Sequence, residues 1–146
     1  MTAEARPNTI RQGDRDKAYR PLSAAVRRAA FDAAMAAYAD GDFFETHELL
    51  EPAWMGTDDL DERALHQGLI KLAAAYVHAV RGNPAGVEKN LAGARFHLAA
   101  TRTAADTYGV DAAALLGAID ARLAALASGD PAPVTHPPAI RRTTTT

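Results

Sequence analysis

Residues 57–83, TDDLDERALHQGLIKLAAAYVHAVRGN, have the spacing of one long helix. Their apolar residues recur at steps of three and four and so share one helix face: Leu65, Leu69, Leu72, Tyr76 and Val80. Thr57 through Glu62 provide a capped, acidic first turn, which suits the positive end of the helix dipole. Gly82 and Asn83 then mark a turn. We therefore predict a helix that lasts to about Arg81.

Four further segments show helical spacing between capping residues, glycines and prolines. We predict helices over about 23–40, 43–55, 84–105 and 111–126. Pro52 lies inside the second of these, where it removes a backbone donor, so we expect a kink or an early stop. No segment shows the alternation that is typical of a strand. The fold class predicted is all-α, with about five helices in an antiparallel bundle built from hairpins.

The length and the ends of the chain suggest its domain organisation. A chain of 146 residues is long enough for one domain, which we place at residues 21–129. Residues 1–20 are polar and basic, and we expect a mobile arm there. Residues 130–146 contain four prolines and end in four threonines, so we expect a disordered tail.

Composition excludes several classes of function. The chain has no cysteine, which removes disulfides, thiolate zinc sites and cysteine nucleophiles. Its net charge is −2 and its basic residues are not interleaved with aromatics, so we expect no nucleic-acid partner. Without a signal peptide or an apolar run of about 18 residues, we expect no membrane span and a cytoplasmic location. An alanine-rich amphipathic bundle has apolar surface left over, which is compatible with a homodimer.

The segment FFETHELLEPAW, residues 43–54, carries a histidine and three glutamates among apolar residues. At about 100° per residue, Phe43, His47, Leu50 and Trp54 share a stripe, which places His47 on the face expected to be buried. Glu51 follows one turn later on the same face. A buried imidazole needs partners for its nitrogens, because an unpaired buried polar group is costly.

Two interpretations of this segment remain open. In the first, His47 and Glu51, together with Glu48, bind a divalent cation or a small polar ligand. HELLE lacks the second histidine of HExxH and the chain lacks paired Glu-x-x-His motifs, so neither a zincin peptidase nor a di-iron site is indicated. In the second interpretation, His47 and Glu51 form a hydrogen-bonded contact in the core that fixes helix register.

The predicted long helix has a second, polar side. Gln67, Lys71 and His78 gather there, whereas His66 lies near the apolar edge and is expected to be a boundary residue. Gly68 has no side chain, which lets another helix approach closely.

Together these residues resemble the DUF309 family over roughly residues 31–100. The resemblance rests on GDFFETHELLEPAW at 41–54, followed by HQGLIKLAAAYVHAVRGNPAGVEKNL at 66–91. It implies a small all-α fold and no particular activity, because the family is defined by similarity alone. It also implies that polar positions on two neighbouring helices form one cluster. The candidate residues for that cluster are Glu45, His47, Glu48, Glu51, Trp54, Gln67 and His78.

Our hypothesis is a binding protein that takes a small polar ligand or a divalent metal at this cluster, with His47 and Glu51 as metal ligands. One alternative is a non-catalytic helical-hairpin module that binds a protein partner and whose polar cluster is structural. A second alternative is a metal-assisted hydrolase, with Glu48 or Glu51 as base and His47 as ligand or acid. The sequence does not decide between an enzyme and a binding protein, and it names no cofactor.

Overall fold

A computed structural model of the protein describes residues 9–12 and 14–143. This part of the chain contains six α-helices, one β-hairpin and one 3-10 helix. In chain order the elements are β1 (Thr9–Gln12), β2 (Arg15–Ala18), α1 (Ala24–Ala39), α2 (Phe43–Met55), α3 (Leu60–Val80), α4 (Pro84–Ala100), α5 (Thr103–Thr107), α6 (Ala112–Ala127) and η1 (Ala132–Thr135). The prediction of an all-α fold is confirmed, with one small hairpin in addition.

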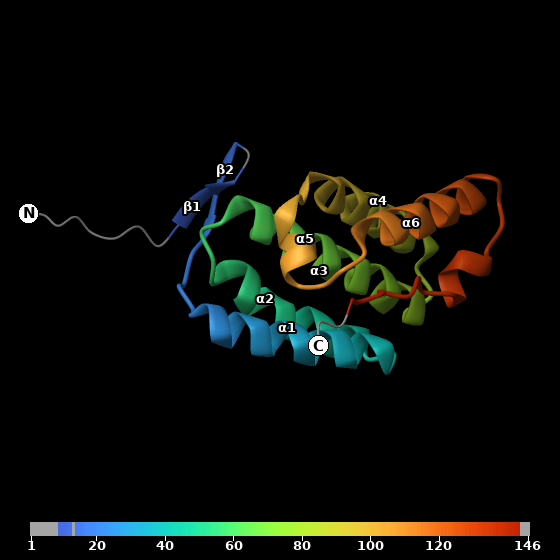
Figure 1. Ribbon diagram of the computed structural model, residues 1–146. Coiled ribbons are helices and arrows are strands. Elements are labelled where there is room, and N and C mark those ends of the chain that lie inside the picture. Colours follow the sequence, from blue (N-terminus) through green and yellow to red (C-terminus); the bar gives the residue numbers. More distant parts are fainter. Residues whose placement is uncertain (1–8, 13, 144–146) are drawn as a thin grey trace, which may run out of the picture.

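Helix α3 lies in the middle of the molecule. Figure 1 shows α1 and α2 on one side of it and α4 and α6 on the other. It packs against both α2 and α4, while α1 covers α2 and α6 covers α4. Four of the five residues on its predicted apolar stripe are at most 1% exposed: Leu65, Leu69, Leu72 and Tyr76. Val80, at the end of the helix, is 81% exposed.

Side-chain caps begin the helices close to where the sequence predicts. The caps are Ser23 for α1, Asp42 for α2, Asp59 for α3, Asn83 for α4 and Asp111 for α6, and each accepts a hydrogen bond from a backbone N–H of the first turn. Pro84 occupies the start of α4, where its missing N–H costs no helical hydrogen bond. Helix α2 continues through Pro52 to Met55, so the expected early stop does not occur.

Helix α4 ends at Ala100, five residues before the predicted end, and a separate helix, α5, begins at Thr103. Thr101 has extended backbone angles, φ −75° and ψ 141°, which break the helix. The carboxylate of Asp61 in α3 accepts hydrogen bonds from the backbone N–H groups of Arg102, Thr103 and Ala104. An acidic residue distant in sequence therefore starts α5.

The N-terminal region contains a hairpin that the sequence analysis did not predict. Strands β1 and β2 are antiparallel, with Thr9 opposite Ala18 and Gln12 opposite Arg15. The chain after β2 is tied to the end of α2, since Arg20 donates its backbone N–H to the carbonyl of Met55 at 2.8 Å. The end of the expected mobile arm therefore contacts α2, whereas residues 1–8 lie outside the described part.

Residues 130–143 of the C-terminal segment make contacts with α1. The hydroxyl of Tyr38 in α1 donates to the carbonyl of Pro138 at 2.7 Å. The guanidinium of Arg142 lies 2.9 Å from the carboxylate of Asp32, also in α1. The buried hydroxyl of Tyr38 and the exposed carboxylate of Asp32 thus hold a proline-rich segment that forms no helix beyond η1. Residues 144–146 lie outside the described part.

Among the described residues, none of the helices has both the length and the apolar character needed to cross a membrane.

Candidate functional site

His47, Glu48 and Glu51 form a compact group of ligand atoms on α2. One such atom from each residue lies within 4.8 Å of the others. Nδ1 of His47 is 3.5 Å from a carboxylate oxygen of Glu48, too far and too poorly placed for a hydrogen bond. That nitrogen is itself buried and has no hydrogen-bond partner among the described residues. One imidazole nitrogen and two carboxylate oxygens are a donor set that divalent cations accept.

The orientation of α2 differs from the predicted one. The fully buried residues of this helix are Thr46, Leu50 and Ala53, whereas the side chain of His47 is 31% exposed. The buried face thus passes through Thr46 instead of through the neighbouring residue His47, as had been expected. Helices α1 and α3 cover α2 from two directions and so decide which face is buried. The three potential ligands consequently lie at the edge of the buried face, where solvent can complete the coordination of an ion.

Trp54 and Gln67 are brought together elsewhere, beneath the N-terminal hairpin. The side-chain amide of Gln12 donates to Oε1 of Gln67 at 2.6 Å. Oε1 of Gln12 accepts hydrogen bonds from Nε1 of Trp54 at 3.3 Å and from Nε of Arg63 at 2.9 Å. The guanidinium of Arg63, which is fully buried, lies 5.1 Å from the centre of the Trp54 ring. Gln12, which the sequence analysis did not single out, therefore joins two of its candidates.

The remaining two candidates have other surroundings. His78 lies at the end of α3, where its Nδ1 is 3.1 Å from the side-chain amide of Asn83. Glu45 is exposed in the first turn of α2, and its backbone N–H donates to the cap residue Asp42. Among the hydrogen bonds and ion pairs of the described residues, none links Trp54, Gln67 or His78 to the group around His47. The candidates thus occupy separate places on the helices.

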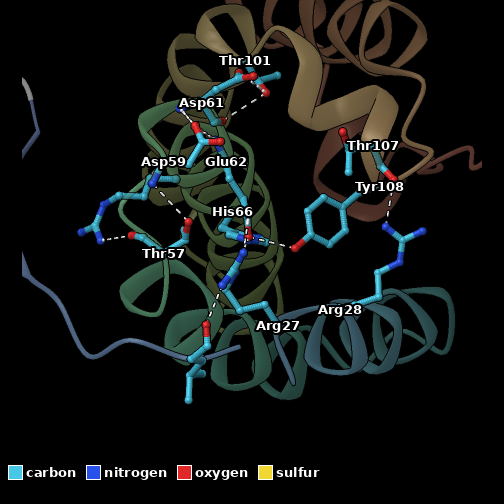
Figure 2. A network of polar contacts seen from close by, with 12 residues as sticks. Arg27, Arg28, Thr57, Asp59, Asp61, Glu62, His66, Thr101, Thr107 and Tyr108 are labelled. Carbon is cyan, nitrogen blue, oxygen red and sulfur yellow. Dashed lines mark hydrogen bonds and ion pairs between the residues drawn. The ribbon is translucent and has the colours of Figure 1, made fainter. Parts of the chain in front are cut away.

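A buried polar network that the sequence analysis missed joins α1, α3 and the residue after α5 (Figure 2). One carboxylate oxygen of Glu62 lies 2.9 Å from Nε2 of His66. The same oxygen accepts hydrogen bonds from Nε of Arg27 at 2.7 Å and from the hydroxyl of Tyr108 at 2.8 Å. The exposed fraction is 8% for Glu62 and 0% for His66.

The network keeps Glu62 ionised. Burial by itself would raise the pKa of the Glu62 carboxyl, but hydrogen bonds from His66, Arg27 and Tyr108 outweigh it and lower that pKa to about 2. Burial and the adjacent carboxylate raise the pKa of Tyr108 to about 12. Nδ1 of His66 is buried without a hydrogen-bond partner among the described residues. The three donors to the Glu62 carboxylate connect separate helical elements, and we assign the network a structural role. The sequence signal for this network was the four-residue spacing of Glu62 and His66. The sequence analysis instead explained Glu62 by helix polarity and His66 by its position at the apolar edge.

Comparison with known proteins agrees with the family resemblance. Residues 31–90 match the model of the domain of unknown function DUF309. Over 79 residues the chain is 34% identical to the uncharacterised protein YpuF of Bacillus subtilis (strain 168), an alignment that covers 54% of this chain and 45% of YpuF. The chain therefore spans less than half the length of this relative. No solved structure gave a significant match.

Proposed function

Residues 31–90 match the DUF309 family model, and on the geometry of α2 within that region we propose that the chain binds a divalent cation. His47 would supply one nitrogen, and Glu48 and Glu51 one oxygen each. The observation that carries the proposal is the convergence of these three ligand atoms within 4.8 Å of one another. Water would fill the remaining coordination positions.

The donor set indicates which ions to test. An imidazole nitrogen favours transition metals over magnesium and calcium, and carboxylates also suit manganese. Zinc and manganese are therefore the first candidates. The unpaired Nδ1 of His47 supports the proposal, since a cation would provide the partner that this nitrogen lacks among the described residues.

The test measures the metal content of tag-free protein purified without chelators, followed by calorimetric titration with zinc and with manganese. We expect about one ion per chain at a site with three protein ligands. His47→Ala and Glu51→Gln should each lower the affinity by at least about tenfold. Glu45→Gln is the matched control, because Glu45 lies on the same helix and outside the group.

Two results would contradict cation binding. One is the absence of bound metal after reconstitution, and the other is an equal loss of affinity in Glu45→Gln. In either case the alternative becomes the better explanation, namely a helical-hairpin module that binds a protein and whose polar groups are structural. In that case His47→Ala would change the free energy of unfolding, and added metal would not change the free energy of unfolding of the wild-type protein.

A further inference from the structure

A cavity of about 490 Å³ lies between the N-terminal hairpin, α3 and α4. Its volume falls within the range of roughly 300–1,000 Å³ that is typical of small-molecule sites. The polar and charged side chains in its walls include Arg15 and Lys17 from β2, Lys71 and Gln67 from α3, and His97 from α4. None of these residues belongs to the group around His47, so the cavity is a separate place on the molecule.

The cavity carries an excess of positive charge. Arg15, Lys17 and Lys71 face a single acidic side chain in its walls, that of Asp14. None of the three cations takes part in an ion pair within residues 9–12 and 14–143. Like charges gathered at one concave surface produce a positive potential, which attracts anions and is relieved when one binds.

His97 lies within this potential. Its burial lowers the pKa of the imidazole, and the charges of Lys71 and Lys17 lower it further. Both lysines, which come from different elements, therefore act on the same point in the cavity. An anion bound between them would counteract that effect and would favour the protonated imidazole.

The walls of the cavity are fixed by packing and hydrogen bonds. The bonds from Gln12 to Gln67, Trp54 and Arg63 hold the hairpin in place over α3. The stem of Lys71 packs next to Gly93 in α4, where a Cβ atom would lie 3.5 Å from Cδ of the lysine, an ordinary contact distance.

The cavity also has an apolar side. Phe96 is 72% exposed and Leu60 is 50% exposed, although both residues line the cavity. The Phe96 ring lies edge-on to His97, with 5.2 Å between ring centroids. A ligand with an apolar or aromatic part would cover this exposed surface, which inorganic anions cannot do.

We propose that this cavity binds a small organic anion, whose phosphate or carboxylate group lies between Lys17 and Lys71 and whose apolar part contacts Phe96. The inference does not rest on cation binding at α2, because the two sites share no residue.

The experiment uses the full chain and three probes: phenyl phosphate, benzoate and inorganic phosphate. Binding is followed by amide NMR shifts and calorimetry. We expect phenyl phosphate to bind more tightly than inorganic phosphate, and comparison with benzoate distinguishes a phosphate site from a carboxylate site. Bound probe should raise the pKa of His97, which imidazole NMR titration measures.

Charge variants of opposite sign sharpen the test. Lys71→Met and Lys17→Met should each weaken phenyl phosphate binding by about tenfold, because each removes a charged hydrogen-bond donor. Asp14→Asn should strengthen binding about twofold by removing a like charge at an exposed position. Lys89→Met is the control for net charge, since Lys89 lies exposed on α4 and does not line the cavity. Urea unfolding establishes that all four variants remain folded.

The proposal is overturned if none of the probes shifts the amide signals of cavity residues, or if Lys89→Met weakens binding as much as Lys71→Met. An unchanged pKa of His97 at saturation would also overturn it. A single-stranded oligonucleotide is a further probe. If it binds more tightly than phenyl phosphate, with a steep dependence on salt, the proposal of a small-anion ligand is wrong and the ligand is a nucleic-acid strand.

Discussion

Glu62 and His66 lie one turn apart in α3 and contact each other at 2.9 Å in the interior of the protein. Arg27 from α1 and Tyr108, which follows α5, bind the same carboxylate oxygen. One ionised carboxylate therefore connects three parts of the chain, since Arg27 lies 35 residues before Glu62 and Tyr108 lies 46 residues after it. Removing any partner would leave a buried polar group unsatisfied, so the stability of the fold depends on this contact.

Acid should unfold the protein through this carboxylate. The pKa of Glu62 is about 2 in the folded state, against an ordinary value of 4.5. Because the folded value is the lower one, the stabilisation is complete above pH 4.5 and is lost as the pH falls towards 2. The shift corresponds to about 3 kcal/mol. Asp61, with a pKa of about 2, contributes in the same direction. Urea unfolding measured across this pH range checks the loss.

Glu62→Gln serves as the control for the acid prediction. The amide keeps the size of the side chain but cannot be ionised, so the pH dependence of the free energy of unfolding should be smaller in the variant. At neutral pH the variant should be less stable by about 3 kcal/mol, the usual cost of breaking a buried ion pair. An unchanged acid transition would show that Glu62 does not govern it.

Gly68→Ala should separate α3 from α4. A Cβ atom at this position would lie 2.6 Å from Cγ of Leu98, well inside contact distance. We expect a loss of about 1–3 kcal/mol in the free energy of unfolding, since overpacking a core has this cost. Gly117→Ala in α6 is the matched control, because nothing lies within 4 Å of its Cβ position, and a gain of about 0.5–1 kcal/mol is expected there. Equal effects in the two variants, measured by thermal or urea denaturation, would contradict the close approach.

Tyr38→Phe should loosen the C-terminal segment. The variant loses the hydroxyl that donates to Pro138 at 2.7 Å, which we expect to cost about 1 kcal/mol. Hydrogen exchange should become faster at Asp111, whose backbone N–H donates to Arg141 in the same segment. Tyr19→Phe is the comparison, because the Tyr19 hydroxyl makes no hydrogen bond within the described part of the chain. Unchanged exchange at Asp111 would show that the Tyr38 contact does not hold the segment.

The sequence alone was sufficient for the fold class, most helix limits and the core face of α3. Helical periodicity and capping are local effects, which depend on residues within a few positions of one another. Ser23 and Asp42 therefore cap helices as their sequence positions indicate, and Asn83, in the predicted turn, caps the next helix. The close helix approach predicted at Gly68 is also confirmed. It could be predicted because a glycine inside a strongly helical segment indicates tight packing.

Only the tertiary structure decided how the polar residues are grouped. Which side of α2 is buried depends on where α1 and α3 lie, and they cover Thr46 rather than His47. The hairpin lies over Gln67 through Gln12, which is 55 residues away, and Arg27 reaches Glu62 across 35 residues. Contacts at such separations leave no periodic signal in the sequence, because they arise from the packing of whole elements. The sequence by itself thus determined the helices and their apolar faces, and the packing determined which charged groups meet.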